Sequence, residues 1–451
     1  MQSFEIDKSD LLRIKTALEG DDAGLEVVLQ EYHASEIAIL FEKLPQEAKE
    51  RIINMLPADI ASEVLSEMTE ESHPEDLLLN MHPDKRSDIV EELDYDDATD
   101  IISQLEEHEQ HEILQDIDQE DAHNIRALLK YDEDTAGGLM NSEIIKVNIN
   151  LDKKEALDEI IRQSEEMEEF YTIYVVDDEN VLQGILSIKS IIKARSDARV
   201  SDLVDKNFIY VKAELDQEDV AGLISQYNLT TIPVVDDNMK LLGRVTVDDI
   251  IDVMEQESTE DILKISGVSE DEELSGNWKE AVKSRLPWLV INLGTAYLAA
   301  SIIRHFDSTV SQLPQIAAYM TIIAGMGGNA ATQSLAVTVR RISLSDLSDA
   351  QAYNTVLKEF LVGLLNGAAN GLIVFAIAMF YDADPLLGLV LFLAMTGNLV
   401  IAGLTGASIP LVLKRVGIDP AVASSIIITT FTDCAGFLLP LWLASKFLLH
   451  S

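Results

Sequence analysis

The sequence predicts a multidomain protein of class α plus α/β, in which a helical-repeat domain and two α/β units precede a five-helix transmembrane domain. Three observations lead to this prediction: a sharp change in charge along the chain, two internal repeats, and five long apolar segments. The 451 residues have a formal net charge of −46. Residues 1–280 contain 71 acidic and 24 basic side chains, whereas residues 281–451 contain 8 and 9. This division indicates two regions in two solvents, and the acidic balance argues against a general nucleic-acid binder.

Residues 1–136 are predicted to form an acidic, superhelical N-domain built from short repeats. Apolar anchors recur every 12 or 13 residues, at Leu44, Leu56, Met68, Met81, Leu93, Leu105 and Ile117. Prolines follow two anchors at Pro45 and Pro57, and proline is favourable at a helix start because its missing N–H is not needed there. The spacing predicts one short helix per repeat, stacked into a solenoid. Five scattered histidines are interpreted as surface polar residues rather than ligands: His73, His82, His108, His111 and His123.

Residues 137–200 and 201–250 are predicted to be two copies of a longer repeat. Tyr174–Asp178 matches Pro233–Asp237 at an offset of 59 residues, and the same offset takes Gly184 to Gly243. Each copy has the pattern strand, helix, strand, glycine turn, strand and helix. The pattern therefore predicts two small α/β units of the same fold.

Tandem units of this kind resemble a cystathionine-β-synthase-type (CBS) pair, a regulatory module that often binds adenine nucleotides. The second copy has the Thr-x-x-Asp of the resemblance at Thr246 and Asp249, where the Asp would meet ribose hydroxyls. The first copy has Ser187 and Ser190 without the Asp. The resemblance implies at most one nucleotide site per chain, with ATP as the ligand, although Thr-x-x-Asp is also an ordinary helix cap.

Residues 251–284 are predicted to connect the CBS pair to the membrane, and an acidic amphipathic helix over residues 248–265 leads into this segment. Its carboxylates are either a solvated face or part of a switch. Self-repulsion among the excess negative charges opposes close approach of the domains. Divalent cations that bridge carboxylates would relieve this repulsion, so the domains would close with the ion bound and splay without it.

Residues 285–451 are predicted to be a transmembrane domain, because each of five apolar segments reaches the ~18 residues expected of a span. The segments are Leu286–Ile303, Leu313–Val339, Phe360–Tyr381, Pro385–Leu413 and Pro420–Ser445. If the spans alternate, most flanking bases fall on one side: Lys279, Lys283, Arg285, Arg340, Arg341, Lys358, Lys414 and Arg415. Only Arg304 and Lys446 fall on the other side. This bias places the acidic half in the cytoplasm and the C-terminus outside.

Asp433 is the acidic residue of this region that lies in the middle of a span. An ionised carboxylate at that depth costs at least ~2.5 kcal/mol. It is either protonated and bonded to Thr429, Thr430 or a neighbouring helix, or part of a cation pathway, and the second is favoured because buried membrane acids are functional by default. One carboxylate is a poor cation site, so we infer a two-fold homodimer with two Asp433 side chains facing one pore. Few charges beside hydroxyl and carbonyl oxygens would suit hydrated Mg²⁺.

Small and polar residues interrupt three of the predicted spans. The second span contains GMGGNAATQS over Gly325–Ser334, which predicts either a close helix contact or a pore lining. The third contains Gly363, Gly367 and Gly371 at every fourth position, which predicts a packing seam. Four residues of the fourth span are interpreted in the same way: Gly397, Asn398, Gly403 and Gly406.

An acidic helical N-domain, a CBS pair, a connecting helix and five spans, in this order, are similar to the MgtE family of bacterial magnesium channels. The most specific matches are GGNAATQS (327–334), RLPW (285–288), VDDIIDVMEQESTEDI (247–262) and TD-x-x-GF (432–437). The resemblance covers nearly the whole chain. It implies a homodimeric, multi-pass Mg²⁺-selective channel in the lipid of the inner (plasma) membrane, shut by cytosolic Mg²⁺ through a connecting helix that acts as a plug.

The resemblance also assigns residues to sites by position. The pore metal site would be formed by Asp433, Thr429, Gly436 and Asn329. Regulatory Mg²⁺ would be bound by acids of the N-domain, the CBS pair and the plug: Asp96, Asp100, Asp216, Glu218, Asp248, Asp249, Asp252, Glu257, Glu260 and Asp261. ATP at the CBS pair would tune the sensitivity to Mg²⁺.

Three other functions are compatible with parts of the sequence. A carrier that exchanges a divalent cation, Mn²⁺ or Co²⁺ included, for Na⁺ or H⁺ could use one buried acid per protomer as a proton site. A CBS-regulated sensor without transport is disfavoured by the polar stretch in the second span. An enzyme is least favoured, because the sequence has no P-loop, nucleophile elbow or HExxH motif.

Overall fold

The computed structural model describes residues 8–69, 72–164, 170, 172–268, 278–344 and 348–449. The chain divides into two compact units, Met1–Met254 and Glu255–Ser451, and each is described here by itself. Residues 269–277 of the predicted connecting segment lie outside the described residues, as do residues 1–7 of the predicted N-domain.

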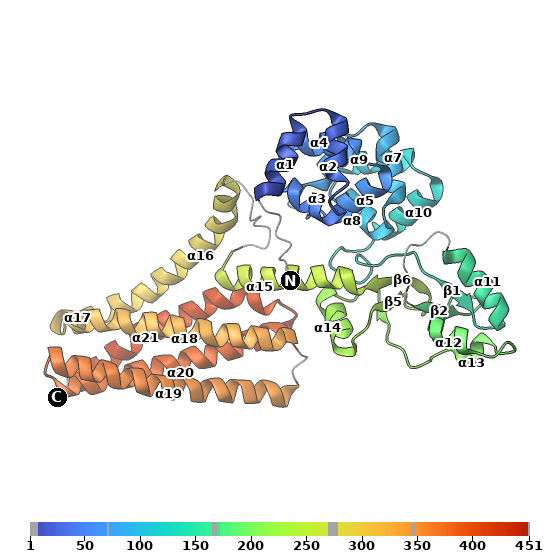
Figure 1. The fold of residues 1–451 in the computed structure, drawn as a ribbon. Helices are drawn as coiled ribbons and strands as arrows, with labels where there is room; N and C mark the ends of the chain where they lie inside the picture. The colour runs from blue at the N-terminus through green and yellow to red at the C-terminus, as the bar shows by residue number, and fades with distance from the viewer. Residues whose placement is uncertain are drawn as a thin grey trace. The chain divides into compact units, whose positions relative to one another are not determined.

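The first part of unit 1 is a stack of short helices (Figure 1). The helices are α1 (Lys8–Leu18), α2 (Asp22–Leu29), α3 (Ala34–Phe41), α4 (Gln46–Met55), α5 (Ala58–Ser66), α6 (Pro74–Leu79), α7 (Pro83–Glu92), α8 (Tyr95–Ser103), α9 (Glu107–Asp116) and α10 (Gln119–Leu128). Each predicted anchor lies just after the end of one helix, and each is at most 8% exposed in a shared apolar core. The prediction of one helix per repeat is confirmed, because burial at every twelfth or thirteenth residue is what stacks the helices.

The second part of unit 1 contains two three-stranded sheets of the same topology. The first sheet has strands β1 (Lys146–Asn148), β2 (Ile173–Val176) and β3 (Leu182–Leu186), and the second has β4 (Val211–Lys212), β5 (Thr231–Val235) and β6 (Leu241–Thr246). In each sheet the first pairing is parallel and the second antiparallel. The helices are α11 (Lys153–Ser164), α12 (Ile188–Lys193), α13 (Val200–Leu203), α14 (Gln217–Tyr227) and the start of α15 (Val247–Ser266).

The prediction that Gly184 and Gly243 form turns is wrong, because these glycines lie inside β3 and β6. A Cβ atom at Gly184 would lie 2.4 Å from the Asp205 carbonyl oxygen, and one at Gly243 would lie 2.6 Å from the Asn141 carbonyl oxygen. Both glycines therefore allow a loop to approach a strand closely. The turns themselves contain Asn180 and Met239, whose φ angles are +64° and +62°.

The two α/β copies pack against each other through their sheets. The Leu241 amide donates to the Asn180 carbonyl at 3.0 Å, and the Leu182 amide donates to the Met239 carbonyl at 2.9 Å. The Tyr174 ring is fully buried between the copies, and its hydroxyl donates to Thr231 Oγ1 at 3.3 Å. The polar groups of Tyr174 and Thr231 thus meet inside a largely apolar interface.

Unit 2 begins with the C-terminal part of α15 and continues into long helices. They are α16 (Trp278–His305), α18 (Ile316–Leu344), α19 (Asp349–Tyr381), α20 (Pro385–Val416) and α21 (Pro420–Phe447), with the short α17 (Asp307–Gln312) after α16. Helices α18, α19, α20 and α21 lie alongside one another, while α16 runs at an angle to them (Figure 1). Helix α20 packs against α18, α19 and α21. Among the described residues, four helices are long and apolar enough to cross a membrane: Ala281–His305, Asp349–Tyr381, Pro385–Val416 and Ser425–Phe447.

The predicted glycine seam in the third apolar segment is confirmed between α19 and α20. A Cβ atom at Gly363 would lie 2.5 Å from the Leu399 carbonyl oxygen, and one at Gly367 would lie 2.8 Å from Thr396 Cα. Only glycine allows the two backbones to approach this closely. The seam fixes α19 against α20, the helix on which α18 and α21 also pack.

Candidate functional site

The Asp433 side chain lies on α21, the last of the long apolar helices, and it is half-buried within one protomer. Among the residues that the structure describes, no hydrogen bond or ion pair reaches its carboxylate. The hydroxyls of Thr429 and Thr430 donate to the Ser425 and Ile426 carbonyls, both at 2.7 Å. These hydroxyl protons are therefore used within α21 rather than donated to Asp433.

The other expected pore residues differ in their surroundings. Thr429 on α21 and Asn329 on α18 are exposed in the protomer. Gly436 is buried against α18, where a Cβ atom would lie 2.7 Å from Ala324 Cα. Gly436 therefore serves the contact between α21 and α18, while Thr429, Asn329 and part of Asp433 remain on the protomer surface.

The polar stretch of α18 has two different sides. Gly327 and Ser334 face α20: a Cβ at Gly327 would lie 2.2 Å from Asn398 Nδ2, and the Ser334 hydroxyl donates to the Gly403 carbonyl at 3.1 Å. Asn329 on the same stretch is exposed. One side is therefore a helix contact, and the other is polar surface in a helix that runs beside apolar helices.

Three carboxylates gather at the start of α8, within unit 1. Asp94, Asp96 and Asp97 each offer an oxygen within 4.8 Å of the others, which suits a hard cation. Burial raises the pKa of Asp96 well above its usual value, and the charge of Asp249 raises it further. Burial, with the charges of Asp94 and Asp249, raises the pKa of Asp97 to about 8. Asp96 of the N-domain and Asp249 of the CBS pair are thus brought close enough to repel each other.

Asp249 also caps the start of α15. Its Oδ2 atom accepts hydrogen bonds from both the Thr246 amide, at 3.2 Å, and the Thr246 hydroxyl. Burial raises the pKa of Asp249, while the bonds from Thr246 oppose that rise. In the first copy, Ser187 Oγ accepts from the Ser190 amide at 3.1 Å in the same position of α12. Helix capping therefore accounts for both motifs, and the nucleotide role of Thr246 and Asp249 stays a prediction.

Five other expected acids of unit 1 are exposed. Asp100 lies on α8, and Asp248 and Asp252 lie on α15 near Asp249. Asp216 is the N-cap of α14, where its Oδ1 accepts from the Glu218 amide at 2.9 Å. Glu218 is exposed in the first turn of α14.

The remaining plug acids lie at the end of α15, within unit 2. The Ser343 hydroxyl at the end of α18 donates to Asp261 Oδ2 at 3.3 Å. Lys264 forms ion pairs with Glu260 and with Asp419, which precedes α21, the second at 2.9 Å. Burial and the charge of Asp419 raise the pKa of Asp261. Glu257 is half-buried on the same helix. The end of α15 is therefore attached to the long helices by charged and polar contacts.

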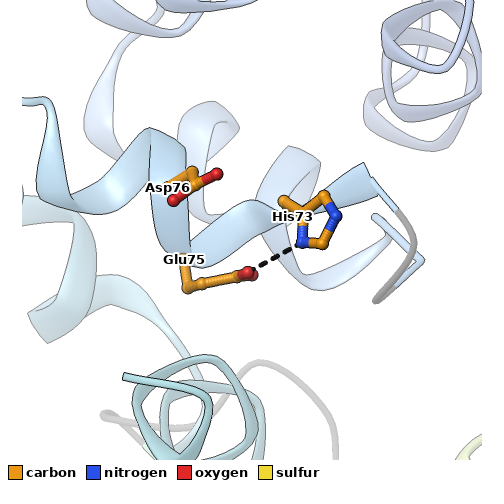
Figure 2. A group of neighbouring side chains, drawn as sticks. All are labelled: His73, Glu75 and Asp76. Carbon is orange, nitrogen blue, oxygen red and sulfur yellow. Dashed lines mark hydrogen bonds and ion pairs between the residues drawn. The ribbon is translucent and has the colours of Figure 1, made fainter. Parts of the chain in front are cut away.

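His73 has the surroundings expected of a surface residue. Its side chain is 51% exposed, and its Nδ1 atom lies 2.9 Å from Glu75 Oε1 at the start of α6. Figure 2 shows the Glu75 carboxylate turned toward the imidazole ring, with Asp76 on the same helix. The three residues could hold a metal ion by spacing alone, but an ion pair between the exposed His73 and the partly buried Glu75 at a helix start is sufficient to explain them.

Several residues of these groups were not expected from the sequence. Asp94 and Asp97 flank the expected Asp96, and the run DYDDATD was the available signal. Lys264 and Asp419 are 155 positions apart, so no local pattern joins them. The contact of Ser343 with Asp261 had no sequence signal either.

The mutual repulsion of Asp96, Asp97 and Asp249 predicts a pH dependence. An ordinary aspartate has a pKa of about 4, so between about pH 4 and 8 the folded protein keeps a proton that the unfolded chain has released. The free energy of unfolding should therefore fall as pH rises through this window. The melting temperature of the wild type, measured in buffer with EDTA, should therefore fall between pH 5 and 8. Asp97→Asn should make this fall smaller, by about 2–4 °C for each kcal/mol of unfolding free energy that the variant no longer loses. The exposed Asp84→Asn is the control, and equal pH slopes for both variants would contradict the prediction.

Comparison with known proteins agrees with this arrangement. Three family models match the chain: a divalent cation transporter model over residues 320–443, an MgtE intracellular N domain over 32–134, and a CBS domain over both 136–197 and 200–256. The chain is 34% identical to a magnesium transporter MgtE of Thermus thermophilus over 436 residues, covering 94% of this chain and 95% of the relative. It is 38% identical to one of Enterococcus faecalis, covering 72% and 71%.

A solved structure is similar to the first unit. It is the cytosolic domain of the Mg²⁺ channel MgtE in complex with ATP, with 34% sequence identity and a TM-score of 0.51. The match covers 54% of this chain and 99% of that structure.

Proposed function

The chain belongs to the MgtE family, and from this premise we propose that it is a Mg²⁺-selective channel for magnesium uptake that cytosolic Mg²⁺ closes. The family is one of transporters rather than enzymes. The acidic N-domain and CBS pair are cytosolic parts of a membrane protein, whose C-terminal half contains, among the described residues, four helices apolar enough to cross a membrane.

The observation that carries the proposal is the position of Asp433. Its carboxylate lies in an apolar helix and has no hydrogen-bond or ion-pair partner among the described residues, which is costly unless an ion or water reaches it. A second protomer would supply a second Asp433, and two carboxylates beside Thr429, Gly436 and Asn329 would attract a divalent cation. Mg²⁺ releases its waters reluctantly, so the pore would select it in hydrated form.

The proposed pore needs two copies of the chain and five spans in each. We include α18 as the fifth span because its 29 residues exceed the length of a bilayer core. Its exposed polar side can be accommodated in a membrane only against protein or water. With five spans, the cytosolic N-terminus requires the C-terminus to be outside, in an inner membrane whose inside-negative potential drives entry by about 2.3 kcal/mol per charge per 100 mV.

The proposed closing of the channel uses the acidic groups described above. Asp96 and Asp249 repel each other at the contact of the N-domain with the CBS pair, and the carboxylate donor set there fits Mg²⁺. Binding of the ion would remove the repulsion and stabilise the closed arrangement, and ion loss would favour separation. The end of α15, through Asp261 and its contact with Ser343, would transmit this change to the long helices.

ATP is proposed as a regulator at the CBS pair. The residues present fit a nucleoside, because the Asp249 carboxylate is an acceptor for ribose hydroxyls and Thr246 holds it in place. The first copy, with Ser187 and Ser190, lacks this acceptor. One ATP per chain would therefore bind, and it would change the Mg²⁺ concentration at which the channel closes.

Reconstitution of the purified protein in liposomes tests the proposal. We expect Mg²⁺ influx that a membrane potential drives and that millimolar Mg²⁺ on the cytosolic face abolishes. Absence of Mg²⁺ flux under a potential would contradict the function. Flux that requires a Na⁺ or H⁺ gradient would instead support the coupled carrier, in which Asp433 exchanges a proton.

A further inference from the structure

Asn398 of α20 is a fully buried amide in a contact between two long helices. Its exposed fraction is 0%, and its Nδ2 atom donates to the Ile323 carbonyl of α18 at 2.8 Å. Its Oδ1 atom is buried without a hydrogen-bond partner among the described residues. An amide oxygen without a partner in hydrocarbon is costly, whereas a leucine of similar size would pack there without this cost. Stability alone therefore does not account for an asparagine at this position.

Gly327 of α18 leaves the space that the Asn398 side chain occupies. A Cβ atom at Gly327 would overlap Asn398 Nδ2. The Ile323 carbonyl that accepts from Asn398 lies four residues before Gly327, so it is also the regular helical partner of the Gly327 amide. On the same side of α18, the adjacent turns have side chains at Ile323 and Ala331, so the turn of Gly327 is the one that admits the amide.

A second hydrogen bond joins the same two helices in the opposite sense. The Ser334 hydroxyl of α18 donates to the Gly403 carbonyl of α20 at 3.1 Å. Apolar contacts are non-directional, so they let packed helices slide and rotate against each other. The two hydrogen bonds are directional and lie about 16 Å apart along α18, from Ile323 to Ser334. Together they fix the height and the rotation of α18 against α20.

This fixed arrangement sets the position of two expected pore residues. Asn329 follows Gly327 by two residues, about 200° around the helix, so it lies on the side of α18 away from α20, where it is exposed. Gly436 of α21 faces Ala324 of α18. The two helices run in opposite directions, because the start of α18 shares an apolar cluster with the end of α21. Asp433, one turn before Gly436, is therefore at the level of Gly327.

We propose that Asn398 is a positioning residue for the cation selectivity of the pore. Its hydrogen bond sets the rotation of α18, and thereby the distance between Asn329 and an ion at Asp433. A rotation of α18 by about 10° moves a side chain on its surface by about 1 Å. That movement exceeds the difference of about 0.4 Å between the ion–oxygen distances of Mg²⁺ and Ca²⁺. The inference rests on the proposed channel, and it adds a residue that acts on selectivity through α18 rather than through the ion.

Liposomes that contain the full-length protein test this role when Mg²⁺ and Ca²⁺ influx are measured separately under the same membrane potential. Asn398→Leu keeps the size of the side chain but not its donor. It should lower the ratio of Mg²⁺ to Ca²⁺ influx by about threefold or more, the effect of one hydrogen bond between membrane helices. The matched control is Asn370→Leu, because Asn370 Nδ2 donates within its own helix, to the Asn366 carbonyl at 2.9 Å. This control should keep the wild-type ratio.

Gly327→Ala tests the same contact from α18. It should lower the ratio as well, because the added Cβ displaces the Asn398 side chain. In the Asn398→Ala background, Gly327→Ala should have little further effect, because the side chain that it displaces is absent. Independent effects of the two substitutions, in which the changes in the ratio multiply, would contradict a role through this contact.

Three further results would overturn the inference. A wild-type ratio in an Asn398→Leu protein of wild-type assembly size would exclude Asn398 from selectivity, while Mg²⁺ influx through the wild type would still support the channel. If Asn398→Leu fails to assemble, a wild-type ratio in Gly327→Ala would exclude the role in the same way. Equal losses of Mg²⁺ and Ca²⁺ influx would indicate a purely structural role. A wild type without Mg²⁺ influx would contradict the proposed channel itself, and this inference with it.

Discussion

Replacement of Asp433 by alanine is expected to reduce Mg²⁺ flux through the protein by about a hundredfold. The carboxylate lies in the last apolar helix, and a cation in that position without it would lose stabilisation comparable to the ~2.5–3.5 kcal/mol cost of a charge in a membrane. Asp433→Asn should lose flux to a similar extent, because it keeps the shape of the side chain but removes its charge. Fluorescent Mg²⁺ indicators inside liposomes measure the flux.

The control for Asp433 is Asp307→Ala, because Asp307 is an exposed acid in α17 of the same unit. This variant should conduct like the wild type. Each purified variant should have the same assembly size as the wild type. An unchanged size would show that a loss of flux is not caused by misfolding. Undiminished, Mg²⁺-selective flux through Asp433→Ala would refute the role assigned to this residue.

The parts of the fold that could be predicted from the sequence are those in which burial repeats at a regular interval. The anchors from Leu44 to Ile117 are all buried, because stacked repeats of 12 or 13 residues bury the same position of each repeat. The seam at Gly363 and Gly367 was predictable for the same reason, since small residues at every fourth position lie on one side of a helix. Gly184 and Gly243 were misplaced because a glycine that admits a neighbouring backbone resembles a glycine in a turn.

The candidate sites could be predicted only where the chemistry is visible in one segment. Asp433 is conspicuous as an acid in an apolar span, and Asp96 is visible in an acidic run. The repulsion between Asp96 and Asp249 depends on how α8 packs near the start of α15, which no local pattern describes.

Neutralisation of the acids on α15 is expected to leave the channel open at high cytosolic Mg²⁺. The variant combines Asp252→Asn, Glu257→Gln, Glu260→Gln and Asp261→Asn. Mg²⁺ can close the channel only by binding the closed state better than the open state, and that difference in affinity requires carboxylate ligands. The concentration of Mg²⁺ that halves the flux should therefore rise by about tenfold or more.

A control variant removes the same amount of negative charge elsewhere on the cytosolic part. It shows whether the effect comes from losing Mg²⁺ ligands or from a general loss of negative charge. Four exposed acids provide this control: Asp84→Asn, Asp197→Asn, Glu106→Gln and Glu107→Gln. A general electrostatic effect would shift both quadruple variants alike, whereas site-bound Mg²⁺ would shift only the α15 variant. Two contacts also attach α15 to the long helices without Mg²⁺, because Lys264 pairs with Asp419 and the Ser343 hydroxyl donates to Asp261. Closure of the α15 variant at the wild-type Mg²⁺ concentration would mean that direct contacts, rather than bound Mg²⁺, hold the helix in place.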